Sequence, residues 1–179
     1  MRLAGLGHIM RNGLYRYIVV FALVGGFFHG VSRAATRTWT GSGNWSSPGN
    51  WSGGQVPGTS DDVVFDGASS TANATVDPAF GGIIASLTIT NGYTGTNTQN
   101  RDLAVTGSVG IVCGTWRFTA GTPASLSVSN DLFLSNCTVY CQYASISGNG
   151  TGRTFVVGGN MTVGTDAVFN AVGLGFPAG

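Results

Sequence analysis

The chain has 179 residues, enough for one domain with a buried core, and only 8% of them are charged. It has no lysine and no glutamate, while glycine, serine, threonine and asparagine are abundant and apolar residues recur regularly among them. This composition argues against a helical protein, because soluble helices rely on Lys and Glu, and against a disordered chain, which lacks regularly spaced apolar residues. We therefore expect an all-β fold.

Residues 1–34 are predicted to be a secretory signal peptide. Three arginines within residues 2–16 precede an uncharged apolar stretch, residues 17–28, which is shorter than the roughly 20 residues needed to span a bilayer. Ser32 and Ala34 supply small side chains for cleavage after Ala34. An uncleaved membrane anchor is the alternative. Cleavage predicts a secreted or cell-surface protein with no segment left in the membrane.

The exported chain would keep four arginines and seven aspartates, a net charge of about −3. Both histidines, His8 and His29, fall in the segment that is removed. Nucleic-acid binding requires clustered Lys and Arg to neutralise phosphates, and anionic lipid surfaces attract the same residues. The sequence therefore predicts neither partner.

Residues 35–80 are predicted to form a tryptophan-rich N-terminal cap together with the first strands. Trp39, Trp45 and Trp51 lie within 13 residues, separated by glycine, serine and proline. Such large rings bury roughly 200 Å² each, so they suit a plug at the open end of a repetitive fold. Exposed, the same three rings would stack on sugars in a carbohydrate site. The first interpretation is favoured, and the second stays open.

Asp61, Asp62 and Asp66 form the only acidic cluster of the chain. Hard cations take several oxygen ligands, so this cluster is a candidate calcium site. The alternative is that the three carboxylates bond to water and backbone at turns and strand edges. No other cofactor is predicted.

Residues 81–179 are predicted to be a ladder of repeats. Residues 103–118, 126–141 and 155–170 align without a gap, and a fainter copy begins at Leu87. The aligned apolar columns are Leu103, Leu126 and Phe155; Val105, Val128 and Val157; Val109, Leu132 and Met161; Ile111, Leu134 and Val163. After residue 112 the alternation shifts by one position, and Trp116, Val139 and Val168 form the next column.

This pattern predicts strands that stack in register. Alternation with a period of two indicates a strand with one buried face, and the shared shift marks a corner, so each copy reads as strand, corner, strand and loop. Copies 23 and 29 residues apart fit turns of a solenoid. We expect a right-handed parallel β-helix, with a β-sandwich of hairpins as the alternative. The ladder shows no polar cap at residues 172–179, which suggests a truncated fragment.

Three cysteines, Cys113, Cys137 and Cys141, lie in the repeats. An oxidising compartment would permit one disulfide, with Cys113 and Cys137 as the candidate pair. The alternative is that all three are small residues filling core positions.

The segment from Trp39 to Val64 resembles the N-terminal module of bacterial proteins with autotransporter-type β-strand repeats. The matching residues are Trp39, Gly41, Asn50, Trp51, Gly54, Pro57, Asp62 and Val64. The later Leu-x-Val-x-Gly ladder is similar to the repeats of such proteins. The resemblance implies an exported passenger or adhesin with a β-helical fold and a carbohydrate or a host-cell or cell-surface ligand.

Catalysis is not expected in these residues. Glycoside-cleaving enzymes need paired carboxylates or a basic residue, and a cysteine nucleophile needs a base. The exported chain has no His, Lys or Glu. The sequence predicts a non-catalytic structural or adhesion protein, and the alternative is the N-terminal part of a carbohydrate-binding or polysaccharide-degrading β-helix protein.

Overall fold

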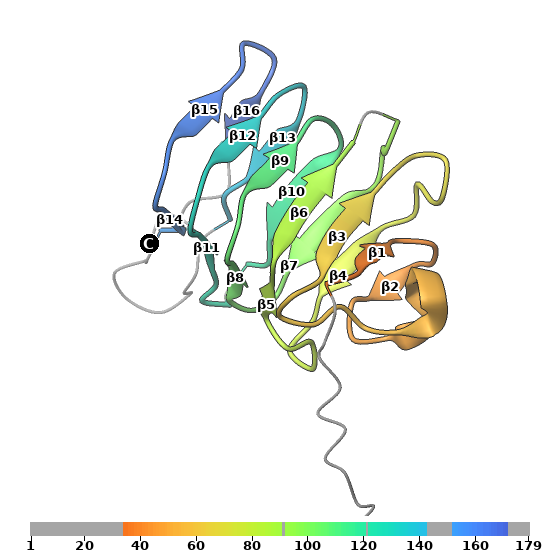
Figure 1. The fold of residues 1–179 in the computed structure, drawn as a ribbon. Helices are drawn as coiled ribbons and strands as arrows, with labels where there is room; N and C mark the ends of the chain where they lie inside the picture. Colours follow the sequence, from red (N-terminus) through yellow and green to blue (C-terminus); the bar gives the residue numbers. More distant parts are fainter. Residues whose placement is uncertain (1–33, 91, 121, 143–151, 172–179) are drawn as a thin grey trace, which may run out of the picture. The chain divides into compact units, whose positions relative to one another are not determined.

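The computed structural model describes residues 34–90, 92–120, 122–142 and 152–171, which form a parallel β-solenoid of about four turns (Figure 1). This part of the chain contains strands, turns and two short 3-10 segments, η2 (Pro48–Asn50) and η3 (Ser52–Gly54), and no α-helix. The predicted signal peptide, apart from Ala34, lies outside the described residues.

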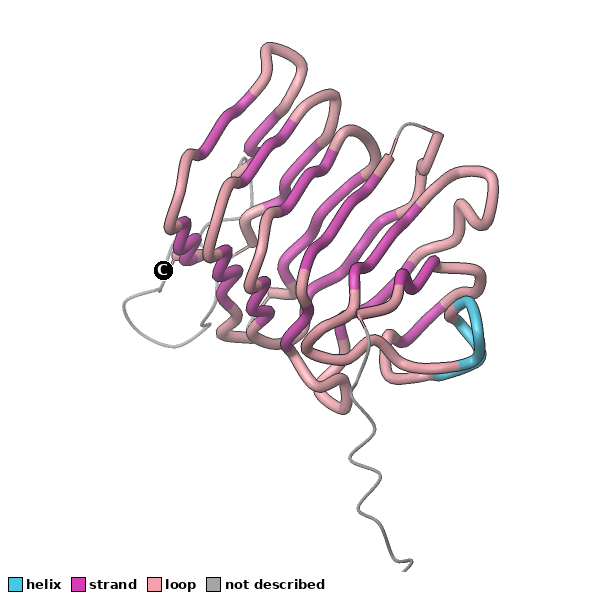
Figure 2. The backbone as a smooth tube through the Cα atoms, viewed as in Figure 1, coloured by secondary structure: helices cyan, strands magenta, loops and turns pink. Residues whose placement is uncertain are grey.

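The strands build three sheets, and the chain visits the sheets in a fixed order (Figure 2). The first sheet contains β1 (Thr36–Thr38), β3 (Asp62–Phe65), β6 (Ser86–Ile89), β9 (Val109–Ile111), β12 (Leu132–Leu134) and β15 (Met161–Val163). The second contains β2 (Gly43–Asn44), β4 (Ala74–Val76), β7 (Thr96–Gln99), β10 (Thr115–Phe118), β13 (Thr138–Tyr140) and β16 (Val168–Asn170). The third contains β5 (Ile83–Ile84), β8 (Leu103–Val105), β11 (Ser125–Val128) and β14 (Thr154–Val157).

Strand pairing confirms the predicted parallel β-helix and excludes the β-sandwich. Every pairing between these strands is parallel, whereas a sandwich of hairpins would pair them antiparallel. The predicted columns are also in register: Leu126 pairs with Leu103 and Phe155, and Leu132 pairs with Val109 and Met161. The handedness of the coil stays a prediction.

Each full turn contains three strands, which corrects the predicted two. The stretch expected to be one strand after Leu103 divides into β8 and β9 at residues 106–108. Gly107 lies at this bend against the preceding turn, where a Cβ atom would come within 2.7 Å of the Ala85 carbonyl oxygen. The alternation concealed the bend because Val105 and Val109 keep the same parity on either side of it.

Two details of the predicted alignment are wrong. Val139 pairs with Phe169 and not with Val168, because the corner before β16 has four residues, 164–167, where the corner before β13 has three, 135–137. The fainter copy is displaced as well. Leu87 pairs with Val109, and the strand equivalent to Leu103–Val105 in the preceding turn is β5.

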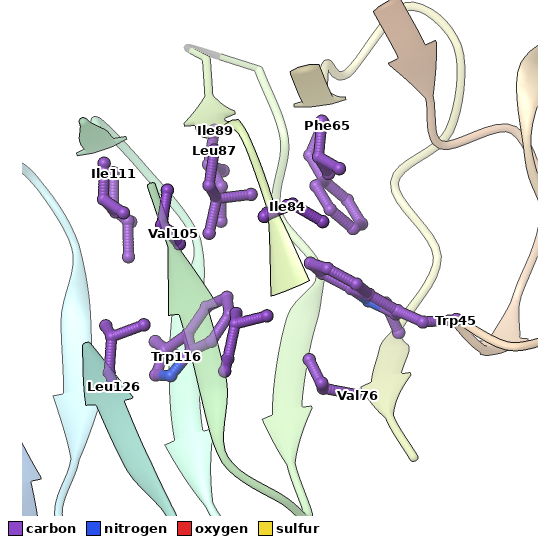
Figure 3. Packing of buried hydrophobic residues seen from close by; sticks show 14 of the residues in the cluster. Trp45, Phe65, Val76, Ile84, Leu87, Ile89, Val105, Ile111, Trp116 and Leu126 are labelled. Atoms are coloured by element: carbon purple, nitrogen blue, oxygen red, sulfur yellow. The ribbon is translucent and has the colours of Figure 1, made fainter. Parts of the chain in front are cut away.

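The core is the space enclosed by the three sheets, filled by the inward side chains of successive turns (Figure 3). Leu87 and Ile89 of β6 lie beside Ile111 of the next turn, and Trp116 reaches in from the second sheet. All four side chains are at most 1% exposed. Burying an aliphatic or aromatic side chain of this size contributes roughly 1.5–3 kcal/mol, so the stacked columns are the main source of stability.

The alternation of β6 allows a direct test of this arrangement. Leu87 is 0% exposed and pairs with Val63 and Val109, so Leu87→Ala should lower the free energy of unfolding by about 2–5 kcal/mol. Thr88 points outward from the same strand, and Thr88→Ala should change the free energy of unfolding by less than about 0.5 kcal/mol. Urea unfolding measures both, and equal effects would contradict the assignment of faces.

Candidate ligand-binding face

The three tryptophans of the N-terminal segment form a buried cluster around Phe65. Trp39 and Trp45 are 0% exposed and Trp51 is 2% exposed. Ring centroids lie 5.0 Å apart for Trp39 and Trp51 and 5.3 Å apart for Trp45 and Trp51, both edge to face. The Trp51 indole N–H donates to the Trp45 carbonyl oxygen at 2.7 Å. Such aromatic pairs add about 0.5–1.5 kcal/mol beyond their buried area.

This burial corrects one predicted site and confirms the competing structural interpretation. A sugar can stack only on an exposed ring face, so Trp39, Trp45 and Trp51 are not a carbohydrate-stacking site in this fold. Residues 50–52 instead run antiparallel to residues 38–40, where β1 ends. The Thr40 N–H donates to the Asn50 carbonyl oxygen, and the Thr38 N–H donates to Ser52 Oγ, each at 2.9 Å. The chain therefore folds back over the end of its own first strand.

The three clustered aspartates have separate structural roles. Asp61 accepts hydrogen bonds from the Gly58 and Ala35 backbone N–H groups and forms an ion pair with Arg37, at 3.3 Å from Arg37 Nε to Asp61 Oδ2. Asp62 accepts from the hydroxyl of Ser86 in the next turn. Asp66 accepts hydrogen bonds from the backbone N–H and the side-chain hydroxyl of Ser69, three residues later in the sequence.

The structure does not bring Asp61, Asp62 and Asp66 together as a calcium site. Among the described residues, no group of three His, Cys, Asp or Glu side chains is placed to hold a metal ion. The acidic cluster is therefore a cluster in sequence only, and its carboxylates fix loops to strands.

The three cysteines are free thiols in the structure, so the predicted Cys113–Cys137 disulfide is not formed. Cys113 and Cys137 are buried at the corners between the first and second sheets of successive turns, which agrees with the alternative that they fill core positions. Burial raises the pKa of the Cys137 thiol, which makes it less reactive as a nucleophile.

The outward side of the second sheet carries a regular polar surface, which we name the threonine face. Its residues lie on β4, β7, β10 and β13 and alternate with buried ones: Thr75, Thr96, Thr98, Thr115, Arg117, Thr138 and Tyr140. Thr115 pairs with Thr96 on one side and Thr138 on the other, and Arg117 pairs with Thr98 and Tyr140. Arg117 is exposed, and its guanidinium carbon lies 5.2 Å from the centre of the Tyr140 ring.

The threonine face is suited to hydrogen bonding along an extended polar ligand. Neighbouring hydroxyls follow one another at about 4.8 Å between strands and about 6.6 Å along a strand. Each threonine can donate and accept, and the planar guanidinium of Arg117 adds up to five donors. The Tyr140 ring adds an amphipathic surface beside them. This combination matches the hydroxyl and carboxylate groups of a polysaccharide better than it matches an apolar partner.

The sequence alone did not indicate this face. Its threonines are 19 residues apart between Thr96 and Thr115 and 23 apart between Thr115 and Thr138. The difference arises because the connection from the second to the third sheet has three residues after β7 and six after β10, and because β11 is one residue longer than β8. Only the strand pairing aligns them.

Comparisons with protein-family models, with curated proteins and with solved structures found no match. The resemblance to autotransporter-type passengers therefore stays a hypothesis, while the parallel solenoid is established by the fold itself. In the described part of the chain, no helix is long and apolar enough to cross a membrane.

Burial alone would raise the pKa of Asp61, but hydrogen bonds from Gly58, Ala35 and Arg37, with the charge of Arg37, outweigh it and hold that pKa below its ordinary value. The stabilisation from Asp61 is therefore present above the ordinary carboxyl pKa of about 4 and is lost as the pH falls through the lowered pKa. We expect Asp61→Asn to lower the free energy of unfolding by about 1–3 kcal/mol at pH 7.

The same variant should show a weaker loss of stability than the original chain on acidification from pH 5 to pH 2. Some acid dependence remains, because the backbone and side chain of Ser46 also hold the pKa of Asp77 below its ordinary value against the opposing effect of burial. Urea unfolding at a series of pH values measures this. An unchanged acid slope would show that Asp61 is not held as described.

Proposed function

We propose that this chain is an exported, non-catalytic structural or adhesion protein whose solenoid presents the threonine face to a polysaccharide at a cell surface. The observation that carries the proposal is the division of each middle turn into inward apolar columns and outward polar rows. Packing uses the inward side chains, and the outward threonines, Arg117 and Tyr140 are left for a ligand. A stacked scaffold keeps them at fixed spacing, which lowers the entropy lost on binding an extended ligand.

The use of the charged groups supports a structural function. Arg101 donates to the carbonyl oxygens of Pro78 and Phe80, and Arg153 donates to those of Thr119, Thr122 and Gln142. These guanidinium groups connect loops of successive turns. Hydrolysis of a glycosidic bond would need two carboxyl groups facing each other about 5–10 Å apart across a substrate. Asp61, Asp62 and Asp66 instead bond to backbone N–H groups, serine hydroxyls and the Arg37 guanidinium.

Arg117 differs from these arginines in being exposed and directed outward. It lies at the centre of the threonine face, between Thr98 and Tyr140. A planar guanidinium binds a carboxylate through two parallel hydrogen bonds, so an acidic polysaccharide is the ligand class that fits this face best. The predicted signal peptide would export the chain, so the chain would meet such a ligand outside the cytoplasm.

The test combines export with binding. The full chain is expressed in a bacterium, recovered from the periplasm, surface or medium, and sequenced from its N-terminus. We expect a mature chain that begins at Ala35 and that is retained by an immobilised uronic-acid polysaccharide. Arg117→Ala should weaken this binding about tenfold to hundredfold, because the loss of one charge-assisted hydrogen bond changes a binding constant by about this factor.

Two control variants test whether binding depends on the threonine face and on the planar guanidinium group, and not on positive charge alone. Arg117→Lys keeps the charge without the planar fork and should recover only part of the affinity. Thr88→Ala lies on the outward side of the first sheet and should bind like the original chain. A mature N-terminus before Arg33 would refute the predicted cleavage, and equal affinities for all variants would refute the threonine face.

A further inference from the structure

The hydroxyls of the threonine face are not used inside the protein. Elsewhere the hydroxyls of Thr90, Thr106 and Thr119 each donate to an acceptor in the preceding turn. In the part of the chain that the structure describes, the hydroxyls of the face make no such bond: Thr75, Thr96, Thr98, Thr115 and Thr138. These five hydroxyls are therefore available to a ligand.

The guanidinium of Arg117 is available in the same way. The other arginines of the described residues all donate hydrogen bonds to carboxylate, amide or carbonyl oxygens: Arg37, Arg101 and Arg153. Arg117 donates none within the described residues and lies over the Tyr140 ring. A guanidinium stacked on a ring keeps the N–H groups in its plane, where they can bind a carboxylate. The ring of Tyr140 therefore positions the cation and leaves its donors to a ligand.

The available groups follow the solenoid axis, the direction in which the turns stack, across β4, β7, β10 and β13 (Figure 1). Across these strands they form two rows, Thr96–Thr115–Thr138 and Thr75–Thr98–Arg117–Tyr140. The second row extends roughly 14 Å, three times the spacing between strands. Along β7, β10 or β13 only two outward side chains follow each other, about 6.6 Å apart. An extended ligand reaches most of these groups only when it lies along the axis.

The side chains change at both ends of the first row. Asn73 lies beside Thr96 in the preceding turn, and Asn73 Oδ1 accepts a hydrogen bond from the Thr96 backbone N–H at 2.8 Å. On the other side Thr138 pairs with Val168, whose side chain forms no hydrogen bonds. The row of available hydroxyls therefore spans three turns, and Arg117 lies in the middle one.

We propose that the threonine face binds an acidic polysaccharide lengthwise along the solenoid axis, over three turns, with a uronic-acid carboxylate on Arg117. This inference rests on the proposed function and adds the orientation and the bound length of the ligand. The carboxylate takes two parallel hydrogen bonds from the guanidinium. The sugars on either side bond through their hydroxyls to Thr96 and Thr138. A ligand lying along β10 would instead meet chiefly Thr115 and Arg117.

Oligomers of galacturonic acid of increasing length test this orientation, with binding to the purified chain measured by calorimetry. We expect the affinity to rise with length until an oligomer spans three turns, and then to change little. The double variant Thr96→Val, Thr138→Val removes both outer hydroxyls and keeps side chains that favour strands. It should weaken binding of the longest oligomer about fivefold to a hundredfold, because one hydrogen bond changes a binding constant about twofold to tenfold. The shortest oligomer should lose less.

Thr88→Val, outward on the first sheet, is the matched control and should bind like the original chain. Circular dichroism establishes that all variants are folded. An affinity that does not depend on length would overturn the proposed orientation. So would a double variant that binds every oligomer like the original chain while Arg117→Ala still weakens binding, and the proposed function would then stand. If the original chain bound no acidic oligomer or polysaccharide, both proposals would be overturned.

Discussion

A turn of this solenoid buries its inward side chains only when another turn lies on each side of it. Leu132 and Met161 occupy the same column in successive turns, but Leu132 is 1% exposed with neighbours on both sides, and Met161 is 44% exposed with one. The hydrophobic free energy of each turn therefore depends on the next turn, as in other stacked repeat folds. Because parallel pairing holds identical positions above one another, a change at one inward position affects two neighbouring turns.

The two ends and the outer surface follow from this constraint. At the N-terminal end the chain itself supplies the missing neighbour: three indole rings around Phe65 fill the interior, and residues 50–52 run antiparallel to residues 38–40 at the end of β1. Charged groups are few and are used mainly to connect loops, as Arg37 does with Asp61. The proposed function uses the outward side chains of the second sheet, where Arg117 lies over the Tyr140 ring among threonine hydroxyls. The proposed polysaccharide binding uses the side of the stack.

Sequence reasoning reached the parallel solenoid because the alternation of apolar residues survives in three gapless copies. It failed where the chain changes length or direction without disturbing that alternation. The bend at Gly107 was missed since Val105 and Val109 keep their parity, and Phe169 was missed because one residue is added in the corner before β16. Asp61, Asp62 and Asp66 lie within six residues of sequence, but strand alternation and turns direct their carboxylates to different partners. The density of tryptophan was compatible with a plug or a sugar site, and only the fold decided between them. The threonine face was invisible because loops of unequal length separate its members.

Amide hydrogen exchange, resolved by residue with NMR, tests the dependence of each turn on its neighbours most directly. We expect the slowest exchange in β6, β7, β9 and β10, whose strands have partners on both sides, and the fastest exchange among the strands in β14, β15 and β16. Exchange from β15 as slow as exchange from β9 would contradict the account, because it would mean that a turn is stable without a second neighbour.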